Sequence, residues 1–229
     1  MNTSEIIVLE GNESDGIQVY EGKVFPEFDA ANQHYYYERW LLNKSDQTFV
    51  SHTTYDMDGR TLVLQQSSSK IDGALITYRE KHLQKNYVGE LVVDGDTALI
   101  RKVMPKDIEQ KKIKLKYPLV TGPTLFGHIE QNWQNLVEFE QKLRVQFVLI
   151  ENVTTMNFII KLEKTDSNIN RFTMKPINSF IGLFVATIYI EFDSTTKQIL
   201  SYSGPVPQYQ IDDNKKFLKV NALTRYTYL

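Results

Sequence analysis

The four histidines are the first residues to test for chemistry, because imidazole is the commonest metal ligand and a frequent acid–base catalyst. They stand singly in the sequence, at His34, His52, His82 and His128. None lies two or four residues from another, the spacing at which a strand or a helix presents two side chains on one face. We therefore expect no histidine metal site. We interpret the four as surface or hairpin-end residues, with His128 exposed.

Calcium, thiol and nucleophile signatures are absent from the sequence as well. Asp56 and Asp58 precede Gly59 as in a calcium loop, but the glycine comes too early and Ser67 stands where a glutamate is needed. The chain has no cysteine, which excludes disulfides and thiolate chemistry. It contains neither Gly-x-Ser-x-Gly nor a glycine-rich phosphate loop. The sequence thus predicts no catalytic residue, no metal ion and no cofactor.

Charge gives little reason to expect nucleic acid. The formal net charge is −2, and a nucleic-acid-binding domain is normally basic. One lysine-rich segment could form a local patch, but it contains a single aromatic residue, Tyr117, and resembles a solvated sheet edge more than a groove. The lysines of this segment are Lys106, Lys111, Lys112, Lys114 and Lys116.

Aromatic residues are the most unusual part of the composition, at 12% of the chain with 13 tyrosines and 12 phenylalanines. They fit two interpretations: the filling of a wide β core, which we favour, or the lining of a ligand cavity oriented by a few tyrosine hydroxyls. For the second, the candidate cavity-lining residues are Tyr36, Trp40, Phe126, Ile129, Trp133, Phe147, Phe158 and Tyr189.

One amphipathic helix is expected, at about residues 123–138. At about 100° per residue its apolar side chains fall within an arc of roughly 120°, and Pro123 suits a first helical turn. Glutamates and amides occupy the rest of the surface, which we expect to be solvated. The apolar stripe consists of Leu125, Phe126, Ile129, Trp133, Leu136 and Val137.

The rest of the chain alternates in the manner of β-strands separated by turn residues. Asp58-Gly59 and Asp94-Gly95 are hairpin signals, and we place a break between strands at Ser67–Ser69. The expected strands are 17–24, 33–42, 48–55, 60–66, 74–82, 87–93, 97–104, 108–117, 143–151, 156–162, 171–175, 183–192, 197–202 and 217–226.

This pattern predicts a mainly β protein. We expect a strongly bent antiparallel sheet or open barrel of about a dozen strands, with the helix covering its concave face. No composition break divides the chain, so we expect one domain over 1–229, with 1–16 as an N-terminal arm.

Three short motifs resemble an uncharacterised bacterial family of domains of unknown function. They are GPTLF at 122–126, NWQNL at 132–136 and GPVP at 204–207. We associate that family with open barrels similar to the lipoprotein-localisation carriers. The resemblance implies a half-closed antiparallel barrel with a helix over an apolar cavity, and it implies no catalytic residue.

The leading hypothesis is therefore a non-enzymatic binding module that holds an apolar or amphipathic small molecule in an open barrel. The alternative is a structural or protein-interaction domain with a filled core, and an enzyme of unknown class comes third. No apolar run is long enough to span a membrane and no signal peptide is visible. We expect a cytoplasmic protein, or a periplasmic one if a signal peptide has been removed.

Overall fold

The computed structural model describes residues 16–44, 46–178 and 186–229. The expected N-terminal arm, apart from residue 16, lies outside these ranges, as do the first three residues of the strand expected at 183–192. Within them the chain forms one 15-stranded sheet. The mainly β fold class is thereby confirmed.

The sheet follows the chain almost without crossovers, in the order β8-β7-β6-β5-β4-β3-β2-β1-β15-β14-β13-β12-β11-β10-β9. All neighbours are antiparallel except β9, which runs parallel to β10. Strands β8 and β9 are the two ends, so the sheet is open. The strands are β1 (Ile17–Pro26), β2 (Tyr35–Lys44), β3 (Gln47–Asp56), β4 (Thr61–Lys70), β5 (Leu75–His82), β6 (Tyr87–Asp94), β7 (Thr97–Met104), β8 (Asp107–Lys114), β9 (Leu119–Val120), β10 (Leu143–Leu149), β11 (Thr154–Asp166), β12 (Ile169–Pro176), β13 (Ile188–Asp193), β14 (Ile199–Ile211) and β15 (Phe217–Tyr228).

Local chemistry sets the connections between these strands. Asp56 accepts hydrogen bonds at Oδ1 from the backbone N–H groups of Asp58 and Arg60, at 3.0 and 2.9 Å, while Gly59 takes a positive φ of 79°. The acidic residues here therefore close a β-turn. The lysine-rich segment contributes β8, which lies at the sheet edge as expected, where charge discourages pairing with another chain.

Two expectations about the strands were wrong. Ser67–Ser69 do not separate strands but continue β4, where all three are buried: Ser69 faces the cleft, and Ser68 is hydrogen-bonded to Thr77 of β5. Strand β14 continues through the GPVP motif, beyond the expected end at residue 202. Its pairing with β15 shifts register between Pro205 and Tyr209, as expected where prolines cannot donate to the ladder.

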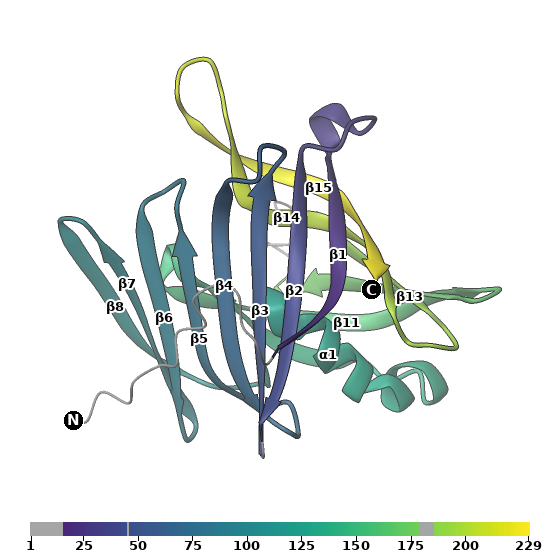
Figure 1. The fold of residues 1–229 in the computed structure, drawn as a ribbon. Helices are drawn as coiled ribbons and strands as arrows, with labels where there is room; N and C mark the ends of the chain where they lie inside the picture. Colours follow the sequence, from purple (N-terminus) through teal and green to yellow (C-terminus); the bar gives the residue numbers. More distant parts are fainter. Residues whose placement is uncertain (1–15, 45, 179–185) are drawn as a thin grey trace.

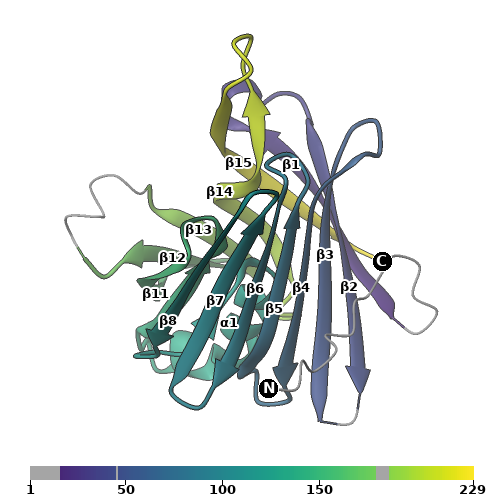
Figure 2. The same cartoon turned by 90° about the vertical axis from the view of Figure 1, so that its left-hand side faces the viewer.

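The sheet bends into two walls, and the helix lies between them. Strands β2 to β8 stand side by side in one wall, while β11 and β13 cross behind them at a steep angle (Figures 1 and 2). Helix α1 (Gly122–Gln131) begins with a reciprocal cap in which the Thr121 N–H donates to the Thr124 hydroxyl at 2.9 Å. After Asn132 and Trp133 a π-helical turn (Gln134–Glu138) follows. The chain is therefore helical over most of the expected range 123–138, but only its first half is a regular α-helix.

The apolar stripe of the helix packs into the main core, against the C-terminal wall. Trp133 contacts Phe172 and Phe192 edge to face, with ring centroids 5.6 and 5.7 Å apart, and Ile129 and Leu136 are fully buried. A second core cluster lies between β5–β7 and the segment around Ile150. None of the helices in the described ranges has the length and apolar character that crossing a membrane requires.

Candidate functional site

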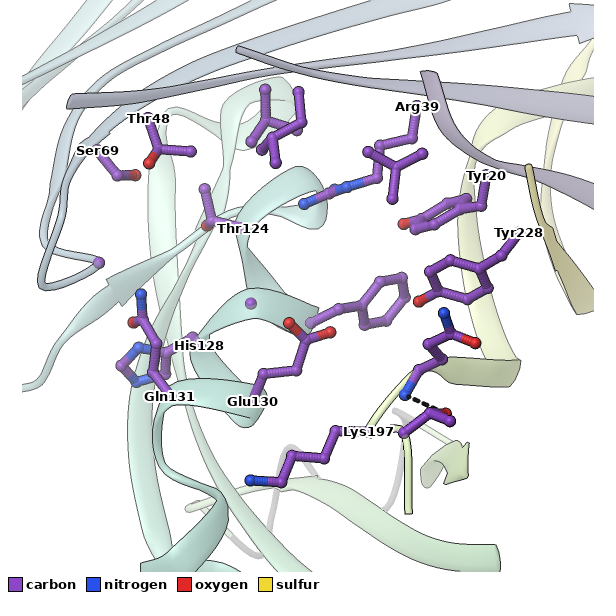
Figure 3. Close-up of a pocket in the computed structure, with 18 of the residues that line it drawn as sticks. Tyr20, Arg39, Thr48, Ser69, Thr124, His128, Glu130, Gln131, Lys197 and Tyr228 are labelled. Atoms are coloured by element: carbon purple, nitrogen blue, oxygen red, sulfur yellow. Dashed lines mark hydrogen bonds between the residues drawn. The ribbon is translucent and has the colours of Figure 1, made fainter. Parts of the chain in front are cut away.

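A half-open cleft of about 430 Å³ separates the other side of the helix from the N-terminal wall. Its walls come from β1 to β4, α1, the turn after β13 and the end of β15 (Figure 3). The apolar lining residues are Val19, Leu41, Val50 and Phe126, and the polar or charged ones are Tyr20, Arg39, Thr48, Ser69, Lys70, Thr124, His128, Glu130, Gln131, Thr196, Lys197, Gln198 and Tyr228.

The alternation of β2 decides which of its residues face the cleft. Side chains point to opposite faces of a strand in turn, and Tyr37 and Arg39 are the buried residues of β2. Arg39 and Leu41 line the cleft, so Tyr36 and Trp40 belong to the other face. The inward residues of β3 are Thr48 and Val50, which approach the helix from the same side.

Arg39 joins the N-terminal wall to the start of the helix. It is only 8% exposed, and its Nη1 donates to the carbonyl oxygen of Pro123 at 2.6 Å. Its guanidinium carbon lies 5.5 Å from the ring centroid of Tyr20, a favourable cation–π distance. Among the described residues no carboxylate forms an ion pair with it.

Two tyrosines, Tyr20 and Tyr228, line the side of the cleft next to Arg39, and Tyr226 packs behind them. The centroid of the Tyr20 ring lies 4.9 Å from that of Tyr226 and 5.4 Å from that of Tyr228, both edge to face. The Tyr20 hydroxyl is buried beside the Arg39 guanidinium, and no described residue accepts its proton. Burial raises the pKa of Tyr20, against the lowering effect of the Arg39 charge, so this hydroxyl keeps its proton at neutral pH.

The polar face of α1 lines the cleft, which differs from the solvated surface expected for it. Thr124, His128 and Gln131 point toward β3 and β4 (Figure 3). His128 is partly buried, its Nε2 has no hydrogen-bond partner in the part of the chain that the structure describes, and burial lowers its pKa, so the expectation of an exposed His128 was wrong. Glu130 also lines the cleft; desolvation raises the pKa of its carboxyl group, against the lowering effect of the Arg39 charge.

The eight residues proposed from the sequence as cavity-lining do not come together. Phe126 alone lines the cleft. Ile129, Trp133 and Phe158 are buried in the main core, and Phe147 packs against it. They fill the space under the apolar stripe, where the sequence-based hypothesis placed a ligand.

The other three face away from that interior. Tyr36 stacks on Tyr55, with ring centroids 4.9 Å apart, and Trp40 shares its face of β2. Tyr189 is 38% exposed, between the buried Ile188 and Ile190 of β13. These residues were assigned to the cavity because their strands carry aromatic residues on both faces. Alternation separates the two faces of a strand, but it does not show which of them is concave.

Sequence reasoning missed Tyr20, Arg39 and Tyr228, which form the polar end of the cleft. A signal was present for Arg39, since it interrupts the otherwise apolar set Tyr35, Tyr37 and Leu41. A charged side chain within such a set either lies at an edge or faces a functional interior. No local pattern marked Tyr20 or Tyr228.

A second polar group lies deeper on the concave face, around Glu80. Its carboxylate accepts hydrogen bonds from the hydroxyls of Tyr78 and Tyr87 and from the amide of Gln65. Every acceptor need of this buried carboxylate is thus met by protein groups, which suits a structural role. No group of three metal-ligating side chains occurs in the part of the chain that the structure describes.

Two buried histidines lie on this polar inner face: His82 at the β5–β6 hairpin end, one of the positions expected, and His52 in the middle of β3, where a surface or hairpin-end residue was expected. His82 is 2% exposed at the end of β5, and its Nε2 lies 3.0 Å from the Pro207 carbonyl oxygen. His52 is buried with neither ring nitrogen hydrogen-bonded within the described ranges. Burial, together with the nearby charge of Arg39, lowers the pKa of His52 to about 3.

Comparison with protein-family models, with curated proteins and with solved structures finds no match for this chain. The site must therefore be interpreted from its own geometry: a cleft with one apolar wall, one tyrosine-lined side and a buried guanidinium.

Proposed function

We propose that the protein is a non-enzymatic binding module that holds an apolar or amphipathic small molecule in the cleft between α1 and strands β1 to β4. The observation that carries the proposal is the cleft itself. Its volume of about 430 Å³ lies within the 300–1,000 Å³ typical of small-molecule sites. Its lining joins apolar side chains to a few polar groups, which is the usual composition of such a site.

The packing of the helix favours this cleft over the space beneath the apolar stripe. That space is occupied by Trp133, Phe172 and Phe192 in edge-to-face contact, so a ligand there would have to displace a packed core. On the cleft side, by contrast, a side-chain carbon built at Gly127 meets no heavy atom within 4 Å. The open space thus lies along one face of an otherwise well-packed helix.

The alternative, a structural or protein-interaction domain, is favoured by the filled core itself. The aromatic residues of the main core already pack against one another, so their number is explained by core packing without a ligand. The two proposals differ in what they predict for the cleft, since only the first requires it to be occupied.

Gly127 supplies a steric test. We expect decan-1-ol or decanoate to bind the wild-type protein in isothermal titration calorimetry, and Gly127→Phe to weaken that binding at least tenfold because its ring would fill the cleft. Gly127→Ala is the matched control. It should keep the affinity and raise the free energy of unfolding by about 0.5–1 kcal/mol, because alanine favours a helix interior over glycine.

Mass spectrometry of organic extracts from the freshly purified protein would show whether a molecule is carried from the cell. Absence of binding of both probes by the wild-type protein, or equal binding by Gly127→Phe and Gly127→Ala, would contradict the proposal.

A further inference from the structure

The Arg39 guanidinium is the most deeply buried charge at the cleft, and none of the described carboxylates forms an ion pair with it. Its polar neighbours among the described residues are neutral: the Pro123 carbonyl oxygen, at 2.6 Å, and the Tyr20 hydroxyl. An arginine carries five N–H donors in a planar fork, so most of them remain available on a side chain that is 8% exposed. A charge so far removed from water is normally paired, because desolvation is otherwise uncompensated.

Tyrosine hydroxyls converge on the same place. Arg39 and Tyr20 extend from the strands toward α1, and the Tyr228 hydroxyl points into the cleft beneath them (Figure 3). The Tyr20 hydroxyl, on a residue that is 2% exposed, lies beside the Arg39 guanidinium, and no described residue accepts its proton. The Tyr228 oxygen accepts the Ile199 N–H at 2.9 Å, which leaves its own proton available for donation.

The charges around the cleft favour an anion over a cation. Arg39, Lys70 and Lys197 line it, and Glu130 is the only carboxylate among the described residues that does. Lys70 and Lys197 are exposed at the rim, where their attraction is long-ranged but screened by salt. The Glu130 carboxylate interacts with the Arg39 charge but forms no ion pair with it, so it opposes an anion in the cleft.

We propose that the ligand of the cleft carries a carboxylate that pairs with the Arg39 guanidinium and accepts from the Tyr20 hydroxyl, while its apolar part lies against Leu41, Val50 and Phe126. This inference rests on the proposed function and specifies the ligand class. A carboxylate offers two oxygens, which match the arginine fork and one hydroxyl. The same geometry leaves a neutral head group with weaker hydrogen bonds to the same donors.

The test compares three probes with the same chain: decanoate, decan-1-ol and decylammonium. For the wild-type protein we expect decanoate to bind at least tenfold more tightly than decan-1-ol, the difference typical of hydrogen bonds to a charged group. Decylammonium should bind most weakly. This order requires no variant, so it remains informative even if a change at Arg39 prevents folding.

Three variants then show which residue is responsible for the preference for decanoate over decan-1-ol. Arg39→Met keeps the unbranched stem of the side chain but removes the guanidinium, and it should reduce the decanoate preference to less than threefold. Lys70→Met, at the rim, should retain most of the preference. Glu130→Gln should tighten decanoate binding and leave decan-1-ol unchanged.

The possible failures are distinguishable. Binding of decan-1-ol and decanoate with equal affinity by the wild-type protein would overturn the carboxylate assignment and leave the proposed function standing. A decanoate preference that survives Arg39→Met in a folded protein would overturn the role of Arg39. Binding of none of the three probes would contradict the proposed function itself.

Discussion

His52 makes the stability of the protein sensitive to acid in a way that can be calculated from its surroundings. The ring is buried on the concave face of β3, 4.7 Å from the Tyr37 ring by centroids, and its pKa of about 3 lies below the ordinary value of 6.5. The folded protein therefore holds this histidine neutral at pH values where the unfolded chain protonates it. Stability is fully present above pH 6.5 and is lost progressively as the pH falls toward 3.

The size of the loss follows from these two pKa values. Between pH 7 and pH 4.5 a single group titrating at 6.5 in the unfolded chain and near 3 in the folded one lowers the free energy of unfolding by about 2.5 kcal/mol. Since pH 4.5 lies above the pKa of the folded histidine, the loss at that pH is set almost entirely by the unfolded value.

His52→Leu isolates this contribution from the carboxylates that also titrate in acid. Urea denaturation of both proteins at pH 7 and 4.5 should show the wild type losing about 2.5 kcal/mol more than the variant. At pH 7 the variant should be at least as stable as the wild type, because it removes two buried nitrogens that have no hydrogen-bond partner among the described residues. Equal losses for the two proteins would refute the account of His52 as a buried neutral base.

Two further changes test the concave face. Glu80→Leu should lower the free energy of unfolding by about 2–3 kcal/mol, because it leaves the Tyr78 and Tyr87 hydroxyls without their acceptor; an unchanged urea midpoint would show that the network contributes nothing. Gly89→Ala should cost about 1–3 kcal/mol, since its new carbon would lie 1.9 Å from a methyl carbon of Ile150, and the added change Ile150→Ala should relieve that clash. If thermal melts show Gly89→Ala to be as stable as the wild type, the packing of β6 against Ile150 is looser than described.

Local sequence patterns were sufficient to predict most of the strands and the start of the helix. Alternation and hairpin residues such as Asp58-Gly59 act over a few positions, so they indicate a strand wherever it pairs. The helical stripe from Leu125 to Leu136 likewise depends only on residue spacing. The open, bent sheet followed from the number of strands and the single helix.

The cleft could not be predicted in this way, because it depends on contacts between distant segments. Arg39 and Pro123 are joined by a hydrogen bond across 84 positions of the chain, and the bend of the sheet alone decides that they meet. The place of Ser67–Ser69 depends on distant contacts for a related reason. A run of serines is typical of a turn, but here the three serines continue β4, with Ser69 facing the cleft and Ser68 hydrogen-bonded to Thr77 of β5.

The apolar face of the helix meets one of the two alternatives expected for it. Phe126, Ile129 and Trp133 were expected to border a ligand or a core, and they border the core, with Phe126 also reaching the cleft. The polar face, expected to contact water alone, presents Thr124 and His128 to the cleft. Amphipathicity shows which face is apolar, but it does not show whether the opposite face lies under a second wall of the sheet.

Photo-crosslinking tests the central claim most directly, because it reports where a ligand lies. A decanoate analogue with a diazirine at the end of its chain would be irradiated with the wild-type protein, and the labelled peptides identified by mass spectrometry. The account predicts adducts concentrated on the segments that contain Leu41, Val50 and Phe126, lost with excess decanoate and lost in Gly127→Phe. Adducts spread over the surface, or concentrated on the outward residues Tyr36 and Tyr189, would contradict it.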